Sequence, residues 1–194
     1  MLDLIPKHQI MKEVFLGFIF FFFSSYSFGQ SSESQNQNVL RFNFINPGIE
    51  YEYSISNKSK LSTNIGYGIS MSYPKLTTIQ QNHAFFIAPF IDLHYKNIYN
   101  ANKRKSKNKN VEYNAGDFIG LKFNVRGENN NSELTRTDQV DFSIATTWGI
   151  QRNYKKINFL FDLGPVYYFD SKGNSGFYPI MLEFNLGYNI WKSE

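Results

Sequence analysis

The most regular hydrophobic pattern in the chain lies near its C-terminus, in residues 177–191. One set of alternate positions is apolar without interruption from Tyr178 to Ile190, whereas the intervening positions hold small, polar or charged residues such as Glu183 and Asn185. Successive side chains of a β-strand point to opposite faces of a sheet, so this segment predicts a strand with one apolar and one polar face. Strands of membrane β-barrels have this pattern, with lipid outside and a polar interior.

The same period of two recurs along the chain and predicts seven further strands, the first of them short. Turn residues and polar loops separate the alternating segments. The eight segments are residues 40–44, 49–55, 61–73, 85–95, 113–126, 140–151, 157–169 and 177–191. The sequence therefore predicts an all-β fold, an eight-stranded antiparallel up-and-down transmembrane β-barrel that follows an N-terminal signal peptide.

The connections between these strands alternate in length, which assigns them to the two ends of the barrel. Short turns at residues 57–60 and 153–156 lie on the side of both termini, the periplasmic side in this interpretation. The longer polar connections fall on the outer side: residues 74–82, 127–137 and 170–176. The long connection at residues 96–110 departs from this rule. It predicts either a short helix or flap under the barrel mouth, or a strand count that is wrong by one.

Proline and glycine mark points where the predicted strands are interrupted or tightly packed. Asn46, Pro47 and Gly48 predict a turn in which proline fixes φ at one central position and Gly48 takes φ > 0 at the next. Pro89 lies within a predicted strand, where it removes a ladder hydrogen bond and indicates a bulge or a local irregularity. The small residues on the inner face of the third strand leave room for a bulky neighbour inside a narrow barrel.

The N-terminal residues predict an export signal rather than part of the fold. An apolar core at residues 14–23 is too short to anchor the chain in a bilayer, and small residues precede a cleavage point before Gln30. The predicted organisation is a signal peptide at residues 1–29, with Met11 as an alternative start, a disordered lead-in at residues 30–38 and an outer-membrane β-barrel at residues 39–192.

Composition limits the chemistry that this barrel can carry. The chain of 194 residues is 18% aromatic and contains no cysteine, which excludes disulfides and thiolate metal sites. Phosphate-loop, dinucleotide and zinc-ligand spacings are absent, so we expect no cofactor and no metal. The net charge of +4 comes largely from one basic run in the long periplasmic connection: Lys103, Arg104, Lys105, Lys107 and Lys109.

The predicted inner face carries a set of ionisable residues that form the candidate site, a lumen charge network. They are Arg41, Glu50, Glu52, Asp92, His94, Lys122, Arg126, Asp141, Asp162 and Glu183. An eight-stranded barrel is just wide enough for side chains to fill, so these groups must be paired across the interior or hydrated. We expect Glu183 to face inward and to pair with Arg41 on the adjoining first strand.

Several stretches together resemble small outer-membrane β-barrel proteins of the Bacteroidota, whose functions are mostly unknown. The similar stretches are the export signal that ends at Gly29, residues 46–53 (NPGIEYEY), the basic connection at residues 99–110 and residues 117–121 (DFIGL). The resemblance covers nearly the whole mature chain, and its motifs are loose patterns. It implies the same fold and location as the alternation, and it transfers no active-site residue.

Three functions fit such a barrel, and the sequence favours the first. A barrel with a side-chain-filled polar lumen has a structural or surface-interaction role and no enzymatic activity. A narrow channel for small solutes or ions is the alternative, and its acidic excess would favour cations. A lipid-modifying outer-membrane enzyme would need a serine held by His94, but Ser70 and Ser72 lie near the opposite end. A soluble lipocalin-like barrel would invert every face assigned above.

The partners expected from the sequence are those of the bacterial outer membrane. They include outer-membrane lipid, with Tyr188 and Trp191 in a periplasmic aromatic girdle, and the outer-membrane assembly machinery, to which the C-terminal strand is presented. The basic run at residues 103–109 is either a solvated connection or an attachment to anionic lipid headgroups or anionic envelope polymer. The export signal argues against nucleic acid as its partner.

Overall fold

The computed structural model of the protein describes residues 36–77, 85–128 and 136–193. The predicted signal peptide lies outside the described residues, as does most of the predicted lead-in. Residues 78–84 and 129–135, which belong to two of the predicted outer loops, also lie outside them.

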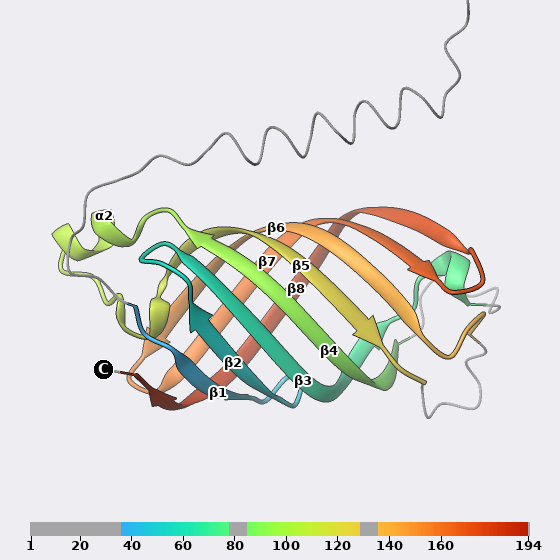
Figure 1. Ribbon diagram of the computed structural model, residues 1–194, viewed down its shortest axis with the longest axis horizontal. Coiled ribbons are helices and arrows are strands. Elements are labelled where there is room, and N and C mark those ends of the chain that lie inside the picture. Colours follow the sequence, from blue (N-terminus) through green and yellow to red (C-terminus); the bar gives the residue numbers. More distant parts are fainter. Residues whose placement is uncertain (1–35, 78–84, 129–135, 194) are drawn as a thin grey trace, which may run out of the picture. The chain divides into compact units, whose positions relative to one another are not determined.

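Eight antiparallel strands form one closed ring, in which β1 is hydrogen-bonded to β8 (Figure 1). They are β1 (Val39–Asn43), β2 (Gly48–Ser54), β3 (Ser59–Met71), β4 (Phe85–Ile98), β5 (Gly116–Arg126), β6 (Asp141–Tyr154), β7 (Ile157–Asp170) and β8 (Ser175–Lys192). Every strand pairs with its neighbours in sequence, which confirms the predicted count and antiparallel order. The ring is uneven, because β1 has 5 residues and β2 has 7, whereas β8 has 18.

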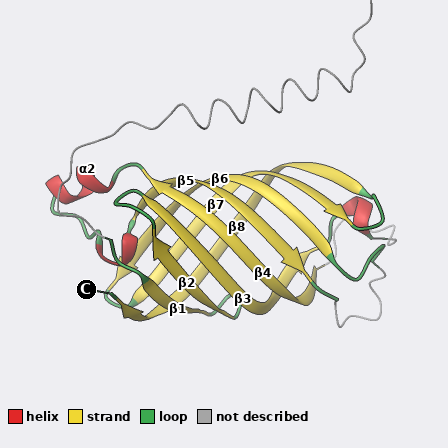
Figure 2. Ribbon diagram, viewed as in Figure 1, coloured by secondary structure: helices red, strands yellow, loops and turns green. Residues whose placement is uncertain are grey.

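Short helical segments lie at both ends of the ring (Figure 2). At the end that carries the C-terminus, here called the terminal end, are α2 (Ala101–Ser106) and the 3-10 turn η2 (Glu112–Asn114); η1 (Pro74–Leu76) lies at the other, the loop end. The helix expected in the long connection is therefore present, and the alternative of a wrong strand count is wrong. No helix in the described part of the chain is long and apolar enough to cross a membrane.

Side chains that point away from the ring are mainly apolar and exposed, whereas those that point inside are mainly polar and buried. In β2, for example, Ile49, Tyr51 and Tyr53 are exposed and Glu50 and Glu52 are buried. The predicted assignment of faces is confirmed for most of the ring. The lipocalin-like alternative is wrong, because it required apolar residues inside and polar residues outside.

A register shift near the loop end of β8 reverses the expected alternation there. Gly164 of β7 pairs with Met181, but Val166 pairs with Tyr178, so β8 contains one extra residue between the two pairs. Tyr178 consequently turns inward against a buried cluster, and Phe177 is exposed instead. The prediction of an uninterrupted apolar outer face is therefore wrong at its first residue, because an extra residue in a strand exchanges the two faces.

A second register shift lies at the terminal end of the same strand. Leu40 pairs with Trp191 and Arg41 with Asn189, which leaves Ile190 as the extra residue. Ile190 and Trp191 are consequently both exposed although they are adjacent in sequence. The outward position expected of Trp191 is confirmed, and the bulge is its physical cause.

Pro89 does not interrupt its strand, so the predicted bulge or local irregularity is wrong. The pairing of β3 with β4 continues through Tyr67 and Pro89 without a shift. The Pro89 carbonyl accepts a 2.8 Å hydrogen bond from the amide of Gly127, the residue that follows the end of β5 at Arg126. The N–H and C=O groups of one residue in an antiparallel strand face the same neighbour, so the missing N–H of Pro89 lies on this side too. The Gly127 carbonyl, left without that donor, accepts a hydrogen bond from Arg136 instead.

Gly48 is needed for close approach of the backbone and not for a positive φ. Among the described glycines, Gly173 has a positive φ and Gly48 does not, so this part of the turn prediction is wrong. A Cβ on Gly48 would lie 2.7 Å from Asn64 Oδ1 and 2.8 Å from the Ile65 carbonyl oxygen. A side chain at this position would therefore push β2 away from β3.

The small residues on the inner face of β3 accommodate Phe90, as the sequence predicted. A Cβ on Gly66 would lie 2.8 Å from the Phe90 ring, and one on Gly68 would lie 2.9 Å from it. The ring of Phe90 is buried and occupies the space that these glycines leave.

The fifth strand is shorter than predicted at its start. Tyr113 and Asn114 have φ values of 51° and 58° and belong to η2, whereas β5 begins at Gly116. Ala115, expected to face outward, is 1% exposed. The predicted outward strand positions of Tyr113 and Ala115 are therefore wrong, because the chain crosses the mouth of the ring before it enters β5.

Candidate functional site

The ionisable residues predicted for the inner face lie inside the ring, where eight of the ten are buried and Asp92 and Glu183 are half-buried. They form a terminal group of Arg41, Glu50 and Glu52, a central group of Asp92, Lys122, Asp162 and Glu183, and a loop-end group of Arg126 and Asp141, with His94 between the terminal and central groups. Each group is assembled from several strands, because alternate residues of neighbouring strands share the inner face.

The terminal group is a balanced set of two cations and two carboxylates. Arg41 donates a 2.8 Å hydrogen bond to Glu50, and its guanidinium lies 4.0 Å from Glu52. Lys96 joins the same two carboxylates, with Nζ 3.8 Å from Glu50 and in direct contact with Glu52. Asn189 accepts a further 2.9 Å hydrogen bond from Arg41 Nε. Buried charges without partners are costly, and here the four charges compensate one another.

The mouth at the terminal end is covered by η2 and by residues 36–38. Asn114, which is fully buried, donates hydrogen bonds of 2.7 Å to Glu52 and 2.9 Å to the Gln37 carbonyl. The Gln151 amide donates a 3.0 Å hydrogen bond to the Tyr113 carbonyl. Gln37 lies in the predicted lead-in, and it is held against the ring by these contacts. The interior is therefore occluded at this end by a hydrogen-bonded polar layer.

The central group is organised around Lys122 of β5. Its ammonium donates to Glu183 at 2.6 Å and to Asp162 at 3.3 Å. Asp162 and Glu183 are directly opposite each other on β7 and β8, where two like charges repel unless a cation joins them. Glu183 faces inward as predicted, but its predicted pairing with Arg41 is wrong. The ladder between β1 and β8 begins only at Gly187, so Arg41 lies too far along the ring.

Asp92 completes the central group, and it accepts a hydrogen bond from Asn124 across β4 and β5. The group then contains the three carboxylates of Asp92, Asp162 and Glu183 and the single ammonium of Lys122. The acidic excess predicted for the interior is local to this middle layer, because Lys96 balances the terminal group and Arg136 adds a second cation to the loop-end group.

His94, the candidate catalytic base, lies between the central and terminal groups. Its Nε2 is 3.1 Å from the Thr147 hydroxyl, and its ring contacts Phe118 edge-on at a centroid distance of 5.4 Å. Across β3 and β4, Ser62 is opposite His94, whereas Ser70 is opposite Phe86. Eight residues of strand therefore separate Ser70 from the level of His94, about 26 Å at 3.3 Å per residue.

The loop-end group is a bidentate ion pair beneath aromatic rings. Arg126 donates two hydrogen bonds to Asp141, at 2.7 Å and 2.8 Å, and a third of 2.9 Å to the Met71 carbonyl. Arg136 approaches the same carboxylate at 2.7 Å. The Arg126 guanidinium also lies 4.2 Å from the centre of the Tyr73 ring, a cation–π contact.

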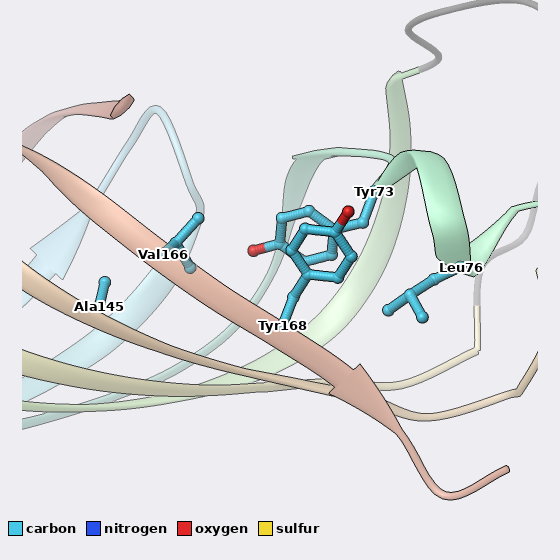
Figure 3. Close-up of a cluster of buried hydrophobic side chains, with 5 residues drawn as sticks. All are labelled: Tyr73, Leu76, Ala145, Val166 and Tyr168. Atoms are coloured by element: carbon cyan, nitrogen blue, oxygen red, sulfur yellow. The ribbon is translucent and has the colours of Figure 1, made fainter. Parts of the chain in front are cut away.

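A buried apolar cluster closes the interior at the loop end (Figure 3). Tyr73 and Tyr168 stack with parallel rings whose centroids are 4.2 Å apart, and η1 places Leu76 beside them. Ala145 and Val166 complete the cluster from β6 and β7. Burial raises the pKa of the Tyr73 phenol, although the nearby Arg126 opposes this rise. Both mouths of the ring are thus covered by side chains.

Three interior cations were absent from the predicted network. Lys96 belongs to the terminal group, Lys60 donates hydrogen bonds to the Ser54 hydroxyl and the Ser56 carbonyl, and Arg136 contacts Asp141. Lys60 and Lys96 continue the inward parity of β3 and β4, so extending the two strands would have identified them. No alternation covers Arg136, which lies outside the strands.

The predicted basic connection forms α2 and the residues that follow it. Its four lysines are exposed: Lys103, Lys105, Lys107 and Lys109. Arg104 is half-buried and donates a 2.8 Å hydrogen bond to the Asn110 carbonyl. Asn100, just before the helix, is hydrogen-bonded to Asp117 of β5, and Asp117 pairs with Arg152 on the outer face. These contacts hold a basic surface against the terminal end of the ring.

In residues 36–77, 85–128 and 136–193, no three or more histidine or acidic side chains are grouped to hold a metal ion. No family model, no curated protein and no solved structure matches the chain. Functional inference therefore rests on the geometry of the ring itself.

Proposed function

We propose that the protein is an outer-membrane β-barrel with a side-chain-filled polar interior and a structural or surface-interaction role. A belt of exposed apolar side chains, to which every strand contributes, supports this function. Representative members, from β1 to β8 in order, are Phe42, Ile49, Ile65, Ile91, Leu121, Ile144, Tyr167 and Leu182.

Such a belt fits lipid better than water. Soluble monomers rarely expose a continuous apolar surface of this kind, whereas a lipid-facing barrel requires one. Strands β3 to β8 contain between 11 and 18 residues, and a tilted transmembrane strand needs about 9–11. The ring closure between β1 and β8 also supplies hydrogen-bond partners to backbone groups that lipid would leave unpaired.

The two covered mouths support a filled barrel over a channel. Polar residues occlude the terminal end, and the cluster around Tyr73 and Tyr168 occludes the loop end. Between them, the charges of Lys122, Asp162 and Glu183 are engaged with one another. A conduit for ions would need these contacts to open, so we infer that the barrel acts through its surface.

We also infer that the basic surface of α2 contacts anionic lipid headgroups. Exposed lysines on and after α2 lie close along the chain to Tyr99, which accepts a 2.9 Å hydrogen bond from Trp148 on the outer face. Tyrosine and tryptophan concentrate at membrane–water interfaces, where lysines can reach lipid phosphates.

Membrane fractionation together with gel mobility tests the proposal. The mature chain should remain with outer membranes after alkaline carbonate extraction, and its mobility should change on boiling, because closed barrels resist SDS until heated. Recovery of the folded chain in the soluble fraction without detergent would overturn the membrane assignment. Stepwise currents in planar bilayers that vanish in the Arg126→Ala or Glu183→Ala variant would overturn the filled-barrel assignment.

A further inference from the structure

The short β1–β2 hairpin leaves its neighbours β8 and β3 paired on one side only over part of their length (Figure 1). The ladder between β1 and β8 ends at Asn43 and Gly187, and the ladder between β2 and β3 ends at Gly48 and Gly66. No described residue forms a ladder with that side of β8 at residues 175–185, here called the β8 edge. The same holds for β3 at residues 67–71, the β3 edge.

The direction of the free backbone groups follows from the last hydrogen bond on each side. The Leu186 carbonyl accepts from the Phe44 amide at 2.7 Å, so Leu186 directs its backbone groups toward β1. Alternate residues of an antiparallel strand face the same neighbour, so Phe184 and Leu182 also direct their N–H and C=O groups to that side. Their side chains point outward and are 42% and 65% exposed.

The β3 edge has the complementary arrangement. The Tyr67 amide donates a 2.9 Å hydrogen bond to the Pro47 carbonyl, which closes the hairpin turn against β3. By the same alternation, Ile69 directs its N–H and C=O groups toward the side where β2 has ended. Met71 also faces that side, but its carbonyl accepts from Arg126.

These edges are costly in the location proposed above. A backbone N–H or C=O group without a partner in the hydrocarbon region costs several kcal/mol, and an acyl chain offers it no hydrogen bond. A long apolar edge strand is also the usual template for pairing with another chain. The β8 edge is the longer of the two, and its most exposed side chains include the apolar Phe177, Ile180 and Leu182.

We propose that the β8 edge binds an extended β-strand of a partner membrane protein, added antiparallel to β8. The partner's backbone would hydrogen-bond to Leu182 and Phe184, and alternate apolar side chains would face lipid beside theirs. A second copy of the chain fits less well. Two copies inserted in the same orientation are related by a two-fold axis along the membrane normal. Their β8 strands would then run parallel to each other, and not antiparallel.

The test is amide hydrogen exchange of the full mature chain, refolded in detergent micelles and observed by NMR. The probe is a short synthetic peptide of alternating valine and threonine, and its fully N-methylated form, which lacks backbone donors, is the control. We expect the amides of Leu182 and Phe184 to exchange faster than that of Leu163, which is paired with Trp148. Added peptide should slow their exchange by about tenfold or more, and the N-methylated peptide should not.

The Leu182→Pro variant distinguishes loss of peptide binding at the β8 edge from a failure of the barrel to fold. Leu182→Pro removes an edge donor that β7 does not use, so the barrel should fold and keep its heat-modifiable mobility, while the peptide no longer protects Phe184. Protection of both amides before peptide is added would overturn the proposal. So would a peptide without effect, or protection by phospholipid vesicles alone. Because the assay uses micelles, these outcomes are independent of membrane fractionation, on which the proposed function depends.

Discussion

Lys122 is the residue on which the central charge group depends. It is 6% exposed, and its ammonium joins two carboxylates that face each other on adjacent strands. Removing one member of a buried ion pair leaves an uncompensated charge, which is more damaging than removing the whole pair. Replacement of Lys122 is therefore the most direct test of the charge pairing in the interior.

We expect Lys122→Met to lower the free energy of unfolding by about 3–5 kcal/mol, because Asp162 and Glu183 then lose their common cation. Urea unfolding of the protein in lipid vesicles would measure the change. Lys75→Met, at an exposed position, should change the stability by less than about 0.5 kcal/mol. Adding Glu183→Gln to Lys122→Met should recover part of the loss, and a double variant no more stable than the single one would contradict this account.

At the scale of elements, η1 acts as a cap that carries Leu76 to the loop end and lets Tyr73 stack on Tyr168. The cap is built from apolar contacts above a charged layer, so it separates Arg126 and Asp141 from the loops. The contribution of this cap to stability should be measurable when the Tyr73 ring is removed.

Tyr73→Ala should cost about 3 kcal/mol of unfolding free energy, because it removes a buried ring and its contacts with Tyr168 and Arg126. Thermal unfolding followed by the heat-modifiable gel shift would measure it. Tyr67→Ala, on the outer face of β3, is the control and should cost less, since that side chain is 42% exposed. Equal losses in the two variants would show that the cap contributes nothing beyond an ordinary aromatic residue.

The helix α2 is the second element with a separable role. Replacing Lys103, Lys107 and Lys109 with glutamine should reduce the phosphatidylglycerol that copurifies with the protein, because each lysine near a membrane surface contributes about 1 kcal/mol of attraction. Mass spectrometry of the retained lipids would measure the ratio of phosphatidylglycerol to phosphatidylethanolamine. Lys75→Gln, at the opposite end, is the control. A ratio that is insensitive to both substitution and salt would contradict headgroup binding.

The strands and their faces could be predicted from the sequence because alternation is a local property, written in each segment by its own residues. The two bulges in β8 could not be predicted in this way. Phe177 and Tyr178 are both aromatic, so either can occupy the outer face, and the pairing with β7 decides between them. The same limit explains the wrong partner of Glu183. Pairing across the interior depends on where each ladder begins, and β1 meets only the last residues of β8.

At the scale of the whole molecule, the ring is apolar outside and polar inside, which is the reverse of a water-soluble barrel. The terminal end holds both ends of the described ring and the basic helix α2, and the loop end holds η1 and the turn between β7 and β8 (Figure 1). A ring placed in a bilayer, as proposed above, should respond to an outward charge according to the depth of the residue in the bilayer, and not according to its exposure.

We expect Leu121→Arg, in the middle of β5, to cost about 2–4 kcal/mol of folding free energy in lipid vesicles, the range found near a bilayer midplane. Tyr154→Arg, at the terminal end of β6, should cost about 0–1 kcal/mol, because a side chain near the interface can keep its charge hydrated. Urea titrations of both variants against the unmodified protein would measure the two costs. The residues are 48% and 77% exposed, so in water both substitutions would be nearly neutral. Equal, small costs would place this surface in water and would remove the basis of the membrane assignment, whereas a large cost confined to Leu121 would establish that the belt lies in lipid.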